Sequence, residues 1–302
     1  MRGLVLLAVF SAIPMHAAEP TPLDAPLRDR CVKILRDGLT SNEFWPAMHA
    51  AEALSLAGHG REVLDAIAKR TESDDQKRCG LAREAVRAGD RSKLSILFAI
   101  LDKPGSNGHT HAAESLFKMA EVGDGTKLRA AFAQNENVKL KLMAAAALAR
   151  CGHPTALVAV RAMLSDPDRE NRKVAAWILG QLGARSDVRS ILAAFKTETD
   201  PLAQAYAVNA RALLGDDAAN KQLLANLSAS EPAVRTYSAE FAGYARLDGS
   251  RDALVRLLND PTLDVRVRAA QSLIVMSQSA GALGLPVAAG RPVLVRDVYP
   301  AT

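Results

Sequence analysis

The sequence repeats at intervals of about 31 residues, and this repeat limits the possible folds more than any other feature. One anchor position recurs in eight helical segments, and successive anchors lie 30 to 32 residues apart: Ala50, Ala82, Ala112, Ala144, Ala175, Tyr206, Ser238 and Ala269. A period of this length is typical of arrays in which each unit stacks on its neighbours. The sequence therefore predicts a row of stacked repeats.

Each repeat is predicted to contain two helices. The anchor lies in the second helix, and an earlier helix is indicated by apolar spacing over residues 156–164, 188–195, 220–227 and 253–258. Asp-Pro or Glu-Pro turns separate several of these helices, and glycine follows the second helix at Gly58, Gly89, Gly152, Gly183 and Gly215. Aromatic residues make up only 4% of the chain, which does not favour a β-sandwich or barrel. We predict an all-α fold, an α-solenoid (superhelix) of about eight helix pairs.

Three segments carry a resemblance to a known family. DRENRKVAAWILGQLG, EPAVRTYSAEFAG and DVRVRAAQSL resemble HEAT repeats, in particular the short HEAT-like repeats related to phycobilisome lyases. The resemblance covers about residues 26–278 and implies a solenoid with an extended concave surface. It implies little about function, because such repeats serve many unrelated tasks.

The two ends of the chain differ from the repeats. Residues 1–18 combine one basic residue, a short apolar run and small residues, which is typical of a signal peptide. A buried N-terminal helix is the alternative. We expect an exported protein, periplasmic or extracellular, with no membrane span. The repeat region is predicted at 19–278 and a tail at 279–302, in which residues 293–298 could instead add a strand to a partner.

Charge and cysteine usage narrow the function classes. The net charge is +5 without a clustered basic patch, so we predict no nucleic-acid partner. Cys31, Cys79 and Cys151 lack metal-type spacing, and we interpret them as core residues.

One helix face changes character along the repeats. The positions five before, one before and two after each anchor share this face. In units four to six its last two positions are apolar, with Ala205 and Val208 in unit six. The first three units are more polar and supply our candidate partner-binding residues: Trp45, His49, Glu52, Glu84, His111 and Glu114. Each Glu that follows a His by three residues is expected to raise the pKa of that His.

A metal site is not predicted from these residues. Deoxyhypusine hydroxylases, which are HEAT-repeat enzymes, bind iron through adjacent His-Glu dipeptides, and this sequence has none. His49 and His111 are two repeats apart, or about 20 Å at ordinary helix spacing, and one ion cannot bridge that distance. We therefore predict no cofactor, no metal and no catalytic residue.

A second column lies three residues before the anchor in later units: Lys141, Arg172, Arg235 and Arg266. It could present a basic strip to an anionic partner. We favour a structural role, in which these side chains bond to the turn acids Asp166, Glu231 and Asp264.

These observations favour an exported, monomeric scaffold without catalysis. Its concave surface is expected to bind a protein or an extended polymer. The alternative is a HEAT-like lyase or metal-dependent hydroxylase that uses the His/Glu pairs, and a third interpretation is an accessory module of a larger exported assembly.

Overall fold

The computed structural model describes residues 20, 22–153, 155–247 and 249–278. Within this part the chain forms sixteen α-helices and two short 3-10 helices, and no strand. The predicted all-α repeat fold is confirmed. The predicted signal peptide and tail lie outside the described residues.

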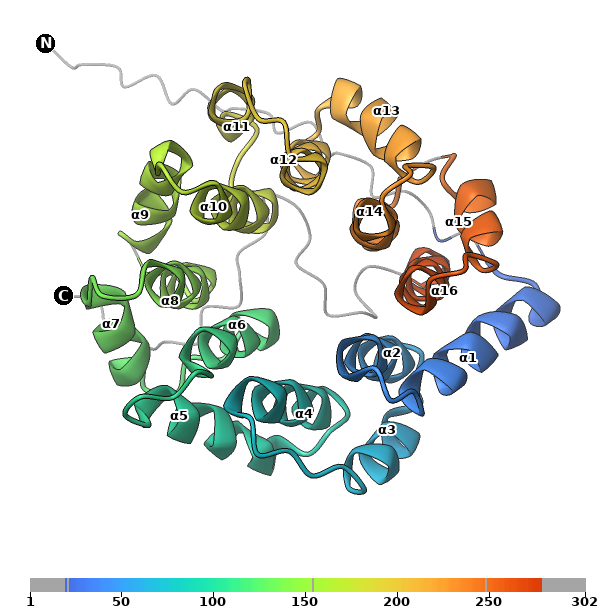
Figure 1. Ribbon diagram of the computed structural model, residues 1–302, viewed down its shortest axis with the longest axis horizontal. Coiled ribbons are helices and arrows are strands. Elements are labelled where there is room, and N and C mark those ends of the chain that lie inside the picture. The colour runs from blue at the N-terminus through green and yellow to red at the C-terminus, as the bar shows by residue number, and fades with distance from the viewer. Residues whose placement is uncertain (1–19, 21, 154, 248, 279–302) are drawn as a thin grey trace, which may run out of the picture.

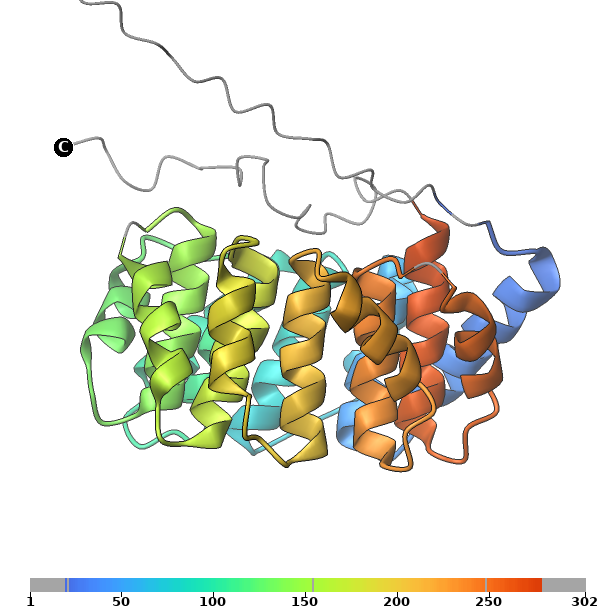
Figure 2. The same cartoon turned by 90° about the horizontal axis from the view of Figure 1, so that it is seen from above.

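The helices alternate between an inner and an outer layer of a ring (Figure 1). The inner helices are α2 (Phe44–Leu56), α4 (Asp75–Arg87), α6 (His109–Met119), α8 (Val138–Arg150), α10 (Arg169–Leu182), α12 (Pro201–Leu213), α14 (Pro232–Tyr244) and α16 (Leu263–Ser277). The outer helices are α1 (Ala25–Leu39), α3 (Gly60–Ile67), α5 (Leu94–Asp102), α7 (Thr126–Ala133), α9 (Ala156–Ala162), α11 (Asp187–Ala194), α13 (Asp217–Asn226) and α15 (Arg251–Leu257). The 3-10 helices are Arg91–Lys93 and Met163–Ser165. From the side, most helices stand roughly parallel to the ring axis (Figure 2).

Small buried residues set the spacing between neighbouring helices. Every anchor except Tyr206 is almost fully buried, as Ala50 and Ser238 are at 0% exposure, so inner helices pack closely side by side. Several helices begin with a side-chain cap, such as Asp168 before α10 and Asp200 before α12, which accepts a hydrogen bond from an otherwise unpaired backbone N–H.

The arginine column has the structural role that we favoured, but with different partners. Arg235 donates to the carbonyl oxygens of Ala229 and Ser230 in its own turn and pairs with Asp260 of the next turn, at 2.7 Å from Nε to Oδ2. Arg172 and Arg266 bond in the same way to the carbonyls before their helices. The side chains of Asp166, Glu231 and Asp264 were predicted as the partners. The three arginines instead donate to backbone carbonyl oxygens of their own turns.

Arg172 shows the same link to the following repeat. Its Nη2 lies 3.1 Å from Oε2 of Glu198, which belongs to the turn before α12. Arg172 and Arg235 thus each tie their own turn to the turn of the following repeat, whereas Lys141 and Arg266 bond within their own turn.

The row of repeats closes on itself, which the sequence did not predict. Helices α1 and α2 pack directly against α16, and one apolar cluster joins residues of α1–α3 to residues of α12–α16. The helices approach closely at Gly38, because a Cβ at this position would lie 2.9 Å from Cγ2 of Val267 and 3.1 Å from Cβ of Ala50. We call this contact between the first and last units the seam.

Polar contacts also cross the seam. Arg30 donates to Oδ1 of Asn259 at 2.7 Å, and Nε2 of Gln278 donates to the carbonyl of Leu56 at 3.2 Å. These partners are more than 200 residues apart in sequence. The seam is therefore a specific interface with both apolar and hydrogen-bonded contacts.

Two further sequence predictions fall on described residues. No helix there is long and apolar enough to cross a membrane. All three cysteines are free, and Cys31 and Cys79 are fully buried while Cys151 is half-buried. The core interpretation is confirmed for Cys31 and Cys79.

Overpacking the seam should destabilise the ring. Gly38→Val places methyl groups where only hydrogen fits, so we expect a loss of about 2 kcal/mol or more in the free energy of unfolding, measured by urea denaturation. Lys33→Val on the exposed face of α1 has the same β-branched side chain and should have a much smaller effect. Equal effects of the two substitutions would contradict the close approach at Gly38.

Candidate functional site

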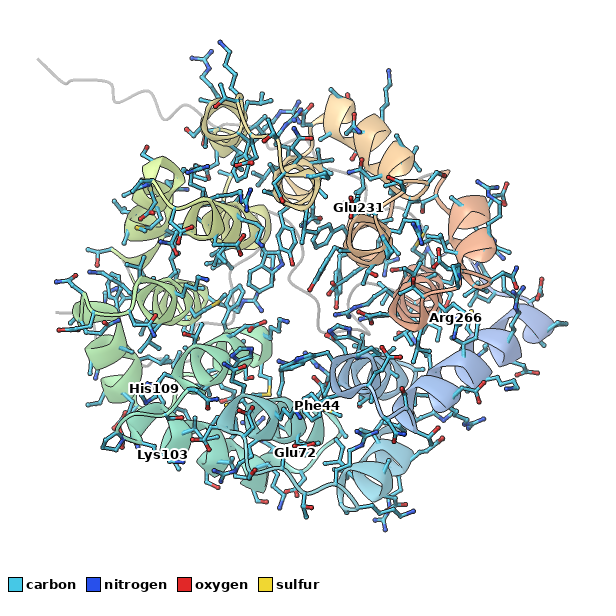
Figure 3. All side chains as sticks on the ribbon, in the orientation of Figure 1. Phe44, Glu72, Lys103, His109, Glu231 and Arg266 are labelled. Carbon is cyan, nitrogen blue, oxygen red and sulfur yellow. The ribbon has the colours of Figure 1, made fainter. Side chains whose placement is uncertain are left out.

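Long side chains from the inner helices project into the centre of the ring (Figure 3). We use the name ring interior for a set of inner-helix residues that are connected by ion pairs, hydrogen bonds and ring contacts: Trp45, His49, Glu52, Arg83, Glu84, Arg87, His111, Glu114, Lys118, Arg150, Trp177, Tyr206, Tyr237, Glu240, Tyr244, Arg268 and Gln271. The set includes the six candidate partner-binding residues.

Trp45 and His111 meet in the ring interior. Their rings stack with centroids 5.5 Å apart and an interplanar angle of 22°, although they come from the first and third units. Nδ1 of His111 is buried and has no hydrogen-bond partner. Burial lowers the pKa of His111, although Glu114 acts in the opposite direction, so the expected rise in this pKa is wrong because desolvation outweighs the carboxylate.

His49 faces the seam and not the glutamate of its own helix. Its Nδ1 lies 2.7 Å from Oδ1 of Asp264 on α16. Burial would raise the pKa of Asp264, but the hydrogen bond and charge of His49 together with Arg268 hold it below its usual value. His49 therefore serves as one of the polar contacts that join the first and last units.

Glu52 and Glu84 are buried in one ion-pair network. Arg87 bridges them, with Nη2 at 3.2 Å from Glu52 and Nη1 at 2.5 Å from Glu84. Arg83 adds a second contact to Glu84 at 2.6 Å, and Glu84 is 0% exposed. Both carboxylates already have charged partners within the protein.

The same network crosses the seam through Arg268. Its Nη1 lies 3.1 Å from Oε2 of Glu52 and 3.4 Å from Oε1 of Glu240, and it donates to Oε1 of Gln271 at 2.6 Å. Gln271 in turn donates to the hydroxyl of Tyr244. Burial alone would raise the pKa of Glu52, but the charges of Arg87 and Arg268 hold it well below its usual value.

Glu114 is more open than the other two glutamates of the candidate set. Its side chain is 22% exposed and pairs with Lys118, at 2.8 Å between Oε1 and Nζ. Burial would raise its pKa, but Lys118 and Arg83 lower it to about 2. Glu114 is thus ionised at neutral pH and partly accessible.

His109 is separate from this site. Its Nε2 donates to the carbonyl of Lys103 at 2.7 Å, and both residues lie away from the centre of the ring (Figure 3). This placement agrees with its position two residues before His111 on the helix.

The repeat register of the sixth unit needs correction. Tyr206, taken as its anchor, is half-buried, whereas Ala207 is 4% exposed. Gly215 follows Ala207 by eight residues, as Gly58 follows Ala50, so this spacing could have identified the true anchor. The shift makes Tyr206 the residue one before the anchor, so it belongs to the ring interior, and unit six is not apolar at this position, contrary to the prediction.

The corrected anchor also changes which residue of unit six lies two positions after the anchor. Asn209, at 1% exposure, replaces Val208 as the residue two after the anchor, and Ala205 loses its assignment. Oδ1 of Asn209 is buried without a hydrogen-bond partner. Unit six therefore contributes a polar and not an apolar pair.

Tyr206 and Tyr237 form an aromatic group on neighbouring helices. Their ring centroids are 5.2 Å apart, and Phe241 lies 5.2 Å from Tyr206. Nζ of Lys173 lies 5.4 Å from the centroid of the Tyr206 ring. Burial raises the pKa of both tyrosines, so both hydroxyls stay protonated at neutral pH.

Several interior residues were missed at the sequence level, namely Arg83, Arg87, Lys118, Arg150, Tyr244, Arg268 and Gln271. Arg268 and Gln271 occupy the column positions one before and two after Ala269, so the repeat already contained their signal. Tyr244 follows from ring closure, because this residue of α14 reaches Glu52 on α2 only when the first and last units meet. Arg83, Arg87, Lys118 and Arg150 contact residues of their own or an adjacent repeat.

No group of three or more His, Cys, Asp or Glu residues in the described part of the chain is arranged to hold a metal ion. The His/Glu pairs instead contact other residue types. His49 contacts Asp264 and His111 contacts Trp45.

A family model described as HEAT repeats matches residues 125–210, and no curated protein matches the chain. Among solved structures, human deoxyhypusine hydroxylase in complex with glycerol is similar at 18% identity and a TM-score of 0.40, covering 83% of this chain and 97% of that one. An engineered protein matches at 18% identity and a TM-score of 0.22, covering 82% and 96%. The family match supports HEAT repeats but not the finer relation to phycobilisome lyases.

Neutralising Glu52 should destabilise the closed ring. Glu52→Gln keeps the shape of the side chain but leaves Arg87 and Arg268 with too little negative charge in a buried setting, so we expect a loss of about 3 kcal/mol in urea denaturation. Glu62→Gln, which removes the exposed pair with Arg36, should change stability little. A Glu52 variant as stable as the Glu62 variant would show that the network does not support the fold.

Proposed function

We propose that this HEAT-repeat protein is an exported, non-catalytic scaffold that binds a partner through the ring interior. Repeat arrays present long surfaces to protein partners without needing a reactive group. The partner we favour is a protein segment or another extended polymer.

The distribution of aromatic residues carries this proposal. The chain has two Trp and four Tyr residues, and every one that lies in the described part belongs to the ring interior: Trp45, Trp177, Tyr206, Tyr237 and Tyr244. All five are partly exposed. Tyr and Trp dominate binding hot spots because they combine a large apolar surface with a polar tip.

The six candidate residues divide into two roles within this proposal. Glu52 and Glu84 are occupied by arginines and His49 by the seam, so these three hold the framework. Trp45, His111 and Glu114 are partly exposed and are assigned to partner contact. Tyr206, Tyr237 and Trp177 extend that contact surface around the ring.

Ring closure restricts how a partner can enter. Because α1 and α2 pack against α16, we expect a partner to approach the interior along the ring axis and not between the first and last units. A segment with a free end, or a narrow loop, fits this access better than a broad folded surface.

Export is supported by the sequence of residues 1–18 and is compatible with the cysteines. Burial raises the pKa of Cys31 to about 11 and that of Cys79 to about 12. Thiols that stay protonated and buried react slowly, so free cysteines at these positions tolerate an oxidising compartment.

Photo-crosslinking tests the interior as the binding surface. A benzophenone amino acid at Tyr237 should form crosslinks to a partner in cells that make the protein, whereas the same group at Leu192, which is exposed on α11, should not. Tyr237→Phe serves as the folding control. Crosslinks from Leu192 alone would place the partner on the outer face and contradict the proposal.

Cell fractionation tests export. When the complete sequence is expressed, the protein should be recovered outside the cytoplasm, and its mass should be lower by about that of a signal peptide. A variant without residues 2–18 should remain in the cytoplasm without further cleavage. Recovery of the uncleaved full chain in the cytoplasm would contradict export.

A further inference from the structure

Arg150 stands apart from the other buried arginines of the ring interior. It is 8% exposed, but no carboxylate pairs with it among the described residues. Nη2 donates to Oε1 of Gln181 at 2.8 Å, while Nε is buried without a hydrogen-bond partner. Arg83 and Arg268, by contrast, each contact a glutamate.

The ion pairs of the interior point to the same residue. Its other cations, Arg83, Arg87, Lys118 and Arg268, each contact at least one of the carboxylates Glu52, Glu84, Glu114 and Glu240. Arg150 has no carboxylate in contact among the described residues. Burial lowers its pKa to about 10, so it remains charged at neutral pH at an energetic cost.

The surroundings of Arg150 fix its orientation. Its guanidinium carbon lies 4.1 Å from the centroid of the Phe117 ring, so one face of the group is covered and its edge is left for hydrogen bonds. Trp177 lies edge-on to Phe117 at 5.3 Å, and Lys118 lies 5.6 Å from the Trp177 ring. The result is a rigid donor between α6, α8 and α10.

We propose that Arg150 binds a carboxylate group of the partner inside the ring. A carboxylate supplies the one counter-charge that Arg150 lacks, and its planar oxygens match the hydrogen-bonding edge of a guanidinium. A phosphate dianion would bring two negative charges to this single guanidinium. This inference rests on the proposed function, since it identifies the chemical group that the interior recognises.

Tryptophan fluorescence provides a direct test with sodium acetate as the probe. Trp45→Phe leaves Trp177 as the only tryptophan, close to the proposed site. Acetate added at constant ionic strength should change its emission in a saturable way, and Arg150→Gln should raise the half-saturating concentration about tenfold or more. Arg161→Gln on α9, whose partner is Asp187, should leave the titration unchanged.

A second variant keeps the test informative if Arg150→Gln fails to fold. Gln181→Glu supplies a built-in carboxylate to the same guanidinium, so it should raise the melting temperature and abolish the acetate response. In the Trp45→Phe protein with Arg150 intact, inorganic phosphate should change the tryptophan emission at higher concentrations than acetate does. A stronger response to phosphate would overturn the carboxylate assignment.

The outcomes separate this inference from the proposed function. The carboxylate site is wrong if the half-saturating acetate concentration is the same with and without Arg150→Gln. It is also wrong if the tryptophan emission does not saturate with acetate in either protein. Partner crosslinks from Tyr237 that persist at full strength in Arg150→Gln would retain the interior scaffold and reject Arg150 as its anchor. Loss of both the crosslinks and the acetate response in Arg150→Gln supports the two together.

Discussion

The packing of α1 and α2 against α16 is the contact on which the arrangement of the interior depends. Without it the repeats would form an open row, in which Glu52 would lack Arg268 and Tyr244, and His49 would lack Asp264. With it, residues more than 200 positions apart become neighbours. The charged side chains of the first unit are thereby buried without being left unpaired, and burial of paired charges is the condition under which they are tolerated in a protein interior.

Local sequence pattern was sufficient for the helices and their order. The anchor spacing identified all eight inner helices, because each must place a small residue against its neighbour once per repeat. Closure could not be predicted in this way. It depends on the small rotation between successive units, summed over eight of them, and no single repeat encodes that sum. Gly38 is a local indication of close packing, but the sequence does not show that Val267 of the last unit is one of the residues it packs against.

The candidate site shows the same division between local and long-range information. The polar break at Trp45, His49 and Glu52 was visible as a departure from an apolar face, but the partners of these residues were not, because they lie on α6, α16 and α4. The contact between Trp45 of unit one and His111 of unit three was also not predicted, because spacing along the sequence does not show which long side chains meet inside a ring. The rule that small residues mark the anchor failed only at Tyr206, where the aromatic faces the interior and the neighbouring Ala207 takes the packing position.

The interior differs from the contacts between helices in the size of its side chains, and both follow from the same geometry. Alanine lets inner helices approach side by side, whereas longer side chains of these helices extend into the centre of the ring (Figure 3). Arginine, glutamate, tyrosine and tryptophan reach it, and their polar tips keep hydrogen-bonding capacity where water is scarce. Most of these tips satisfy one another, as in the network around Glu52. Positions where a tip has no charged partner, above all Arg150, are then the places where a group from another molecule completes the pairing that the ring itself leaves open.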